Sequence, residues 1–372
     1  MVAELFIGLM SGTSLDGVDG VLADFSGDSL AVLAHASAPF PPLLRQELLE
    51  LNSSGPNELH RSALAANALA GVYASVVANL LAQAGIARQQ VSAIGAHGQT
   101  VRHQPQAVDG TGYTLQLNSP ALLAELTGID VVADFRSRDI AAGGQGAPLV
   151  PAFHQSVFGR PGETVAALNI GGISNLTVLG PRLADDILGF DCGPGNALMD
   201  AWCQQHLGHA FDADGAWAAS GQMDTALLAA LLAEPYFAQA APKSTGRDLF
   251  NPAWLAEKLK PFPHLQPADV QATLTELTAR CCADSTKRYS SDSKVLIVCG
   301  GGAFNGHLMA RLQACLPTLQ VCSSQACGLP PLQVEASAFA WLARKTVRRE
   351  TASLPAVTGA HGARILGAIY PA

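Results

Sequence analysis

Two short turns of the chain combine glycine with hydroxyl residues, and the first also contains acidic residues. The first follows the apolar residues that begin at Leu5, and the second lies within the segment 164–179, which is apolar at both ends. Because apolar residues enter and leave each turn, the pattern predicts two β-hairpins. Glycine lets a ligand approach the backbone closely, and hydroxyl and N–H groups can hold phosphate oxygens. An ordinary hairpin turn has a similar composition, because glycine, serine and aspartate are common turn formers. The residues of the two turns are Gly12, Thr13, Ser14, Leu15, Asp16, Gly17, Val18, Asp19, Gly171, Gly172, Ser174 and Asn175.

A third glycine cluster follows the predicted strand 294–299. Gly300, Gly301 and Gly302 let a flat ring or a ribose lie against the backbone, and a helix is predicted from about Asn305. The amino end of a helix carries partial positive charge and attracts anions. The cluster lacks the G-x-G-x-x-G spacing of dinucleotide sites, and the chain contains no G-x-x-x-x-G-K-[ST] loop. The residues therefore exclude these two common nucleotide motifs.

Three carboxylates are candidates for charge and proton chemistry. Asp16 and Asp19 in the first turn could hold a cation or its water shell. Asp191 ends a predicted strand just before the turn 193–195, where a carboxylate can serve as a general base. The alternative is an aspartate that caps the helix predicted over 197–207. The two glycines and the proline of the turn favour catalysis.

Polar residues follow two further predicted strands. His97 and Gln99 come directly after the strand 91–96, and Arg136 comes shortly after the strand 131–133. The carboxyl ends of strands are where α/β proteins usually keep their chemistry. We therefore expect these side chains to contribute to a site.

Two other segments have two interpretations each, and Glu335 has a common structural one. The glycine-rich segment 142–151 could be a linker between domains, but two arginines and two aspartates at 134–139 favour a loop of a site. The polar segment 243–251 could reach a ligand, or it could simply start the helix at Pro252. Glu335 lies in the first turn of the last predicted helix, where an acid is ordinarily an exposed residue favoured by the helix dipole.

Helical periodicity and capping residues predict the elements that position these groups. Phe339 and Trp341 in the last helix are interpreted as core residues. The predicted helices are 41–51, 56–84, 120–128, 197–207, 224–233, 252–260, 266–289, 305–316 and 335–349.

Composition narrows the class of protein. Of the 372 residues, 49% are hydrophobic and 14% charged, which is typical of a globular chain with a sizeable core. The net charge of −8 disfavours nucleic acid and acidic membranes as partners. No secretion signal and no apolar run of transmembrane length is apparent. The eight cysteines form no paired C-x-x-C sets, so zinc and disulfide frameworks are poorly supported, and a cytoplasmic location is expected.

The two similar hairpins lie about half a chain apart. This spacing predicts two similar α/β domains that flank an interdomain cleft, where ligands tend to bind. We place the amino-terminal lobe at residues 1–130 plus about 350–372, with the first phosphate hairpin. The carboxy-terminal lobe is placed at 131–349, with the second hairpin, Asp191 and the third glycine cluster.

Seven ordered segments together resemble the 1,6-anhydro-N-acetylmuramic acid kinases. This family belongs to the superfamily of actin, Hsp70 and sugar kinases, which has duplicated ribonuclease-H-like domains. The resemblance runs from Phe6 to Tyr370, although the acidic residue expected before Glu335 is replaced by the sequence 330–333. The segments are 10–19, 97–100, 134–136 with 143–148, 169–175, 190–196, 244–247 and 299–302.

The resemblance implies an activity. Such an enzyme uses ATP, Mg2+ and water to open the 1,6-anhydro bond of anhydro-N-acetylmuramic acid and to phosphorylate the freed O6. The products are N-acetylmuramic acid 6-phosphate and ADP, in murein recycling and amino-sugar catabolism. The resemblance also implies a homodimer. The alternatives are a kinase for another sugar, and an actin-like, nucleotide-gated binding protein without turnover.

The resemblance also implies roles for individual residues. Asp191 would be the base that takes a proton from water, and the Gly12 to Asp19 and Gly171 to Gly172 turns would bind the phosphates of ATP. Mg2+ would lie near Asp16 or Asp19, and Gly300 to Gly302 with Asn305 would bind the nucleoside. The expected sugar contacts are His97, Gln99, Arg136, Gly195, Asn196 and Glu335, with the Arg136 fork matching the lactyl carboxylate.

Overall fold

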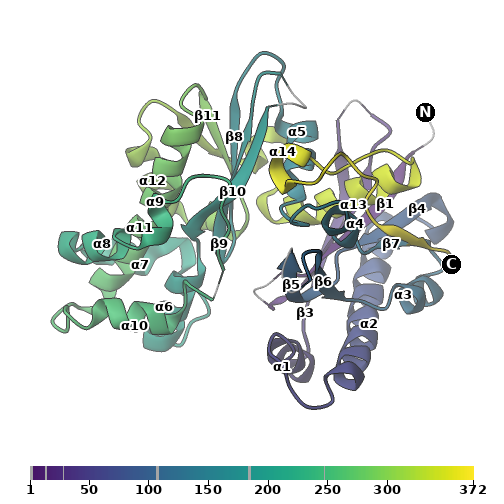
Figure 1. Ribbon diagram of the computed structural model, residues 1–372, viewed down its shortest axis with the longest axis horizontal. Helices are drawn as coiled ribbons and strands as arrows, with labels where there is room; N and C mark the ends of the chain where they lie inside the picture. Colours follow the sequence, from purple (N-terminus) through teal and green to yellow (C-terminus); the bar gives the residue numbers. More distant parts are fainter. Residues whose placement is uncertain (1–2, 13–14, 28, 106–108, 183–185, 247) are drawn as a thin grey trace. The chain divides into compact units, whose positions relative to one another are not determined.

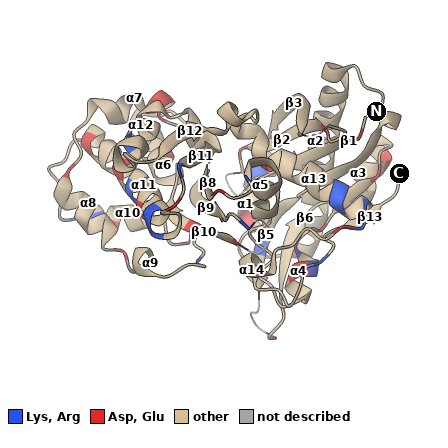
Figure 2. Cartoon of the chain, turned by 90° about the horizontal axis from the view of Figure 1, so that it is seen from above, with Lys and Arg blue, Asp and Glu red and all other residues tan. Residues whose placement is uncertain are grey.

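The chain forms two compact units, which are described here one at a time (Figure 1). The computed structural model describes residues 3–12, 15–27, 29–105, 109–182, 186–246 and 248–372. Unit 1 comprises Met1–Val157 and Leu332–Ala372, and unit 2 comprises Phe158–Pro331. Basic and acidic residues both occur in each unit (Figure 2).

Unit 1 is built on a six-stranded mixed sheet in the order β13-β7-β4-β1-β2-β3. Strands β1, β2 and β3 are antiparallel neighbours. On the other side of β1, strands β4 and β7 run parallel to it, and β13 pairs antiparallel with β7 at the edge. The strands are β1 (Leu5–Met10), β2 (Gly17–Asp24), β3 (Ala31–Pro39), β4 (Val91–Ala96), β7 (Val131–Ala133) and β13 (Ala368–Tyr370). A separate hairpin is formed by β5 (Gln99–Pro105) and β6 (Gly112–Leu117).

Helices pack against this sheet. The last long helix approaches it closely, because a Cβ atom at Gly8 would collide with the carbonyl of Ala336, and one at Gly95 with that of Phe339. Glycine at these two strand positions therefore allows helix and sheet to meet backbone to backbone. The helices are α1 (Pro42–Glu50), α2 (Glu58–Ala84), α3 (Pro120–Thr127), α4 (Ser137–Ala141), α5 (Val150–Phe158), α13 (Val334–Val347) and α14 (Pro355–Thr358).

Helix α2 corrects one expectation from the sequence. By length and composition alone it is apolar enough to cross a membrane, whereas no such run was expected. Leu69, Tyr73, Val76 and Leu80 of this helix are all fully buried in the core of unit 1. The apolar stripe of α2 is thus used to pack the helix on the sheet.

Unit 2 repeats the topology of unit 1. Its sheet has the order β10-β9-β8-β11-β12, with three antiparallel strands followed by two parallel ones. The same succession, β3-β2-β1-β4-β7, is found in unit 1. The prediction of duplicated α/β domains of the ribonuclease-H-like type is confirmed. The strands are β8 (Val165–Ile170), β9 (Ile173–Leu179), β10 (Ile187–Pro194), β11 (Val295–Cys299) and β12 (Gln320–Ser323).

The helices of unit 2 enclose a core of their own. The central helix is buried on all sides from Val270 to Ala279, because other helices and the sheet surround it. The helices are α6 (Ala197–Leu207), α7 (Ala216–Ser220), α8 (Thr225–Leu232), α9 (Pro235–Ala238), α10 (Pro252–Leu259), α11 (Pro267–Tyr289) and α12 (Gly306–Cys315).

The division of the chain differs from the predicted domain boundaries. Strand β7 pairs with β4, and helix α13 packs on β1 and β4, so residues 131–157 and 332–349 belong to unit 1. From the sequence, we predicted that both segments lie in the carboxy-terminal lobe. They were misplaced because strand pairing and helix packing over long sequence separations leave no local pattern.

Candidate functional site

Backbone contacts hold the turn between β1 and β2. The amide of Leu15 donates to the carbonyl of Gly12 at 3.3 Å, and the carbonyl of Leu15 accepts from Arg45 Nε at 3.1 Å. Leu15 has a φ of 59°, which is unusual for a residue with a side chain. Thr13 and Ser14, which the sequence analysis assigned to this turn, lie outside the described residues.

Packing alone explains two residues that follow this turn. A Cβ atom at Gly17 would collide with the carbonyl of Ala38 on β3, and Val18 is buried in the core of unit 1. Asp16, in contrast, is exposed. Its carboxylate is therefore accessible to a ligand.

Asp19 and Glu335 place two carboxyl groups in one electrostatic environment. The Asp19 side chain is 44% exposed, and its Oδ1 lies 3.5 Å from His35 Nε2. Burial, and then the charge of Asp19, raise the pKa of Glu335, while Arg136 opposes this shift. Glu335 is partly buried, so its interpretation as an exposed helix acid was wrong.

Two carboxylates of unit 1 are candidate ligands for Mg2+. This ion usually takes one or two carboxylates together with waters and substrate phosphates. Asp16 and Asp19 supply such oxygens on an accessible surface. Within the described residues, no group of three or more His, Cys, Asp or Glu side chains could hold a metal. The residues thus fit an ion that is held jointly with phosphate.

The structure brings His97 and Arg136 together. Arg136 Nη2 and Nε lie 2.9 and 3.2 Å from His97 Nε2, and Arg136 Nη1 donates to the carbonyl of Gly146 at 2.8 Å. Burial lowers the pKa of Arg136 to about 10, a shift that the charge of Glu335 opposes. The guanidinium nevertheless stays charged near neutral pH.

Gln99 reaches back to the first turn. Its Nε2 donates to the carbonyl of Gly12 at 3.1 Å, whereas its buried Oε1 has no hydrogen-bond partner among the described residues. We did not predict Tyr73 and Ser11 as site residues from the sequence. The Tyr73 hydroxyl accepts from the amide of Gly98 at 3.1 Å and meets Ser11 Oγ at 2.9 Å. Tyr73 lies in the apolar stripe of α2, which gave no polar signal.

The glycine-rich segment 142–151 lies wholly within unit 1, so it is not a linker between units. The buried carboxylate of Asp139 accepts from the amide of Gly146 and from the hydroxyl of Thr358, both at 2.8 Å. Since Arg136 also bonds to Gly146, the segment helps to place that guanidinium.

In unit 2, the turn between β8 and β9 is tied to the start of α6. The amides of Gly195 and Asn196 donate to the carbonyls of Gly172 and Gly171 at 2.9 and 2.8 Å. Ser174 is buried, and its hydroxyl donates to the carbonyl of Pro194 at 3.3 Å. The structure thus brings five predicted site residues into one cluster.

The glycines of this cluster differ in what they are needed for. A Cβ atom at Gly195 would collide with the carbonyl of Gly171. At Gly171 a Cβ atom would meet only the carbonyl of Ile173 at 3.7 Å, and at Gly172 only the Cβ of Ala197 at 3.6 Å. Because these are ordinary contacts, packing within the protein does not require glycine at 171 or 172.

The third glycine cluster packs against the same hairpin. A Cβ atom at Gly300 or Gly302 would collide with Ile170 on β8, and Gly300 has a φ of 77°. Gly301 is exposed, and a Cβ atom there would meet only Asn196 Nδ2 at 3.5 Å. Gly301 is therefore a third glycine that packing does not explain.

Asn305 has a structural role as the N-cap of α12. Its Oδ1 accepts from the amide of Leu308 at 2.9 Å. The predicted strand, glycine cluster and helix are confirmed as β11, the short 3-10 turn Gly301–Phe304 and α12.

Asp191 lies inside β10 rather than at its end, opposite Asn175 of β9. Its Oδ2 accepts from Ser244 Oγ at 2.9 Å and from the amide of Thr245 at 3.0 Å. Burial raises the pKa of Asp191, and these two hydrogen bonds oppose the shift. Its Oδ1 has no hydrogen-bond donor among the described residues.

The backbone of Asp191 is held from the same side. Its amide donates to the carbonyl of Lys243 at 3.0 Å, and its carbonyl accepts from the Tyr236 hydroxyl at 2.7 Å. The N-cap position of α6 is Asn196, so the interpretation of Asp191 as a cap of this helix was wrong. The sequence marked 243–251 as a polar loop but did not connect it with Asp191.

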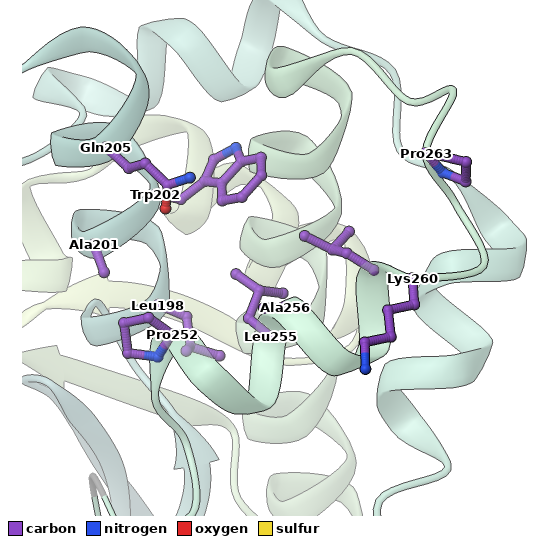
Figure 3. A pocket seen from close by; sticks show the side chains of 10 residues that line it. Leu198, Ala201, Trp202, Gln205, Pro252, Leu255, Ala256, Lys260 and Pro263 are labelled. Carbon is purple, nitrogen blue, oxygen red and sulfur yellow. The ribbon is translucent and has the colours of Figure 1, made fainter.

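One cavity lies elsewhere in unit 2. It measures about 310 Å3 and lies between α6 and α10, where Leu198, Trp202 and Leu255 give it an apolar lining (Figure 3). Its lining contains none of the described residues predicted for the site. The cavity therefore does not mark the predicted chemistry.

The chain is similar to a known protein family over nearly its whole length. The family model for anhydro-N-acetylmuramic acid kinase matches residues 4–372. The anhydro-N-acetylmuramic acid kinase of Albidiferax ferrireducens is 70% identical over 389 residues, and that of Variovorax paradoxus is 67% identical over 375 residues. In both cases the match covers 100% of this chain and 100% of the relative.

Solved structures are similar at low identity. The activator of the 2-hydroxyisocaproyl-CoA dehydratase from Clostridium difficile with bound ADPNP is 12% identical, with a TM-score of 0.48, and the match covers 92% of this chain and 96% of that one. A ROK family glucokinase from Streptomyces griseus in complex with glucose and AMPPNP is 16% identical, with a TM-score of 0.44, and the match covers 92% of this chain and 99% of that one. Because the family model and close relatives match nearly every residue, the chain belongs to the anhydro-N-acetylmuramic acid kinases, a family of phosphotransferases.

Proposed function

We propose that the protein uses ATP to convert 1,6-anhydro-N-acetylmuramic acid into N-acetylmuramic acid 6-phosphate and ADP. Water attacks the anomeric carbon and the bond from that carbon to O6 breaks. O6 then takes the γ-phosphoryl group as the bond to the β-phosphate oxygen breaks. The family match supports the reaction, and the placement of Asp191 supports the step that involves water.

The observation that carries this proposal is the asymmetric environment of the Asp191 carboxylate. Ser244 and Thr245 fix Oδ2, while Oδ1 has no donor among the described residues. A carboxylate that is oriented through one oxygen and open at the other can accept a proton from a nearby water. Asp191 thus takes the proton that the attacking water releases.

The proposal assigns the nucleotide to the glycine positions that packing leaves unexplained. Backbone N–H groups at Gly171 and Gly172 contact phosphate oxygens, and a side chain there would obstruct them. Gly301 gives the nucleoside a flat surface beside the side-chain Nδ2 of Asn196. Gly12 and the rest of the first turn provide further phosphate contacts.

Magnesium is part of the proposal. The carboxylates of Asp16 and Asp19 would hold Mg2+ together with the phosphates. The ion would supply positive charge that offsets the phosphate charge during transfer.

Arg136 is assigned to the lactyl carboxylate of the sugar. Its guanidinium is partly buried and hydrogen-bonded only to neutral acceptors among the described residues. A guanidinium without an anionic partner forms strong, charge-assisted hydrogen bonds with a carboxylate that binds beside it. The unpaired Oε1 of Gln99 would accept from a sugar hydroxyl, and Glu335, Gly195 and Asn196 complete the proposed sugar contacts.

We also propose a cytoplasmic homodimer. All eight cysteines are free thiols, as expected in a reducing compartment. Leu43 on α1 is 83% exposed and Leu59 on α2 is 89% exposed, and we place the subunit contact at these two leucines. Analytical ultracentrifugation of the wild-type chain and a Leu43→Ser, Leu59→Ser variant would test this assignment.

Product analysis in 18O-labelled water tests the reaction directly. We expect mass spectrometry to find one 18O atom at the anomeric position and an unlabelled phosphoryl group on O6. Phosphorylation without ring opening would indicate a kinase for another sugar. Nucleotide binding without any product would indicate a non-catalytic binding protein.

A further inference from the structure

Both ring nitrogens of His97 are already used by the protein. The ring is part of a side chain that is only 5% exposed and packs 4.7 Å from the ring of Phe339. Nδ1 lies 3.2 Å from the carbonyl of Ser11, and Nε2 meets the guanidinium of Arg136. A carbonyl only accepts and a guanidinium only donates, so the proton lies on Nδ1 and Nε2 is the acceptor.

His97 is neutral in this arrangement. Burial, and then the charge of Arg136, lower the pKa of His97 to about 3. A protonated ring would place a second cation against Arg136 and would lose the acceptor at Nε2. The neutral ring therefore adds no second positive charge beside Arg136 near neutral pH.

Some N–H groups of the Arg136 guanidinium are hydrogen-bonded within the protein, and others remain available to a ligand. His97 Nε2 accepts from Nε and Nη2, and the carbonyl of Gly146 accepts from Nη1. The nearby carboxylate of Asp139 bonds instead to Gly146 and Thr358. One N–H group on each terminal nitrogen remains for an external acceptor.

We infer that His97 is a positioning residue, which holds the Arg136 guanidinium in place for the carboxylate arm of the sugar and does not itself touch the sugar. This inference rests on the proposed function, and it replaces the direct sugar contact that the sequence suggested for His97. The role requires a neutral acceptor at the position of Nε2 and a buried ring that cannot turn away.

Steady-state kinetics with two sugars test the inference. The probes are 1,6-anhydro-N-acetylmuramic acid and 1,6-anhydro-N-acetylglucosamine, which lacks the carboxylate arm. We expect His97→Asn to raise KM for the first sugar about tenfold, with kcat, KM for ATP and turnover of the second sugar nearly unchanged. His97→Gln, whose amide oxygen can reach the position of Nε2, should restore much of the affinity.

A double variant separates positioning from direct contact. If His97 acts through Arg136, then His97→Asn should add nothing to the KM of Arg136→Ala. Additive effects on KM, or equal losses for both sugars, would overturn the inference. His60→Asn is the control, because His60 is an exposed histidine on α2 in the same unit. It should leave both KM values unchanged.

A spectroscopic measurement keeps the inference testable if the variants fold poorly. In 15N NMR of the wild-type protein, His97 should show the Nδ1–H form throughout pH 5 to 8, identified by its loss in His97→Gln. An Nε2–H form or a protonated ring in this range would overturn the inference. Absence of any sugar phosphorylation by the wild type would instead contradict the proposed function, whatever the state of His97.

Discussion

At the scale of residues, Asp191 carries the strongest prediction. Asparagine keeps the shape of the side chain but cannot take a proton from water. We expect Asp191→Asn to lower kcat by about a thousandfold or more, while the Kd of a non-hydrolysable ATP analogue changes little. Isothermal titration and product assays measure the two quantities. Turnover close to that of the wild type would remove Asp191 from the mechanism.

Ser244 affects the pH dependence of the reaction through the pKa of Asp191. Its hydrogen bond lowers the pKa of Asp191, so its loss raises that pKa. Since the base must be ionised, activity falls as the pH drops through this pKa. We expect Ser244→Ala to move the acidic limb of kcat/KM upward by about half a pH unit, a small shift because Ser244 is exposed. Ser220→Ala, another exposed serine of unit 2 that bonds to a backbone carbonyl, is the control.

The individual residues also show where sequence reasoning stops. Asp191, Arg136 and Gln99 were predicted as site residues because polar groups near the ends of predicted strands are a local pattern. The hydrogen bond from Ser244 to Asp191 spans 53 positions, and that from Tyr73 to Ser11 spans 62. Contacts of this length depend on how the strands and helices pack, so no local signal marks them.

At the scale of elements, the hairpin between β8 and β9 allows a test of glycine. An alanine at 171 fits without strain, whereas one at 195 would collide with the backbone of Gly171. We expect Gly171→Ala to keep its melting temperature within a few degrees but to raise KM for ATP about tenfold. Gly195→Ala should instead lower stability by about 1–3 kcal/mol. An unchanged KM in Gly171→Ala would show that no phosphate lies at this turn.

The elements were predicted well where the pattern is local. Alternating or continuous apolar runs beside glycine turns gave both hairpins, and helical spacing gave α2, α11 and α12 to within a few residues. The environment of each element was harder to predict. Helix α2 has the composition of a membrane span, and only its packing on the sheet of unit 1 explains that composition.

At the scale of the whole molecule, the chain leaves unit 1, forms unit 2 and returns. The predicted boundary at residue 130 was too early and the return at about 350 too late, because β7 and α13 complete the sheet and core of unit 1. Unit 2 is one continuous segment with its own hydrophobic core. This asymmetry has a consequence for folding.

We expect the fragment 158–331 to fold alone, because all of its sheet, core and central helix α11 lie within it. The fragment 1–157 lacks α13, against which Gly8 and Gly95 leave room for close packing, and it lacks the edge strand β13. It should therefore show no cooperative transition in thermal circular dichroism. Joining 1–157 to 332–372 through a flexible linker should restore one, because the missing helix then returns to its strands. A folded 1–157 fragment, or an unfolded 158–331 fragment, would mean that the two cores do not stabilise their units independently.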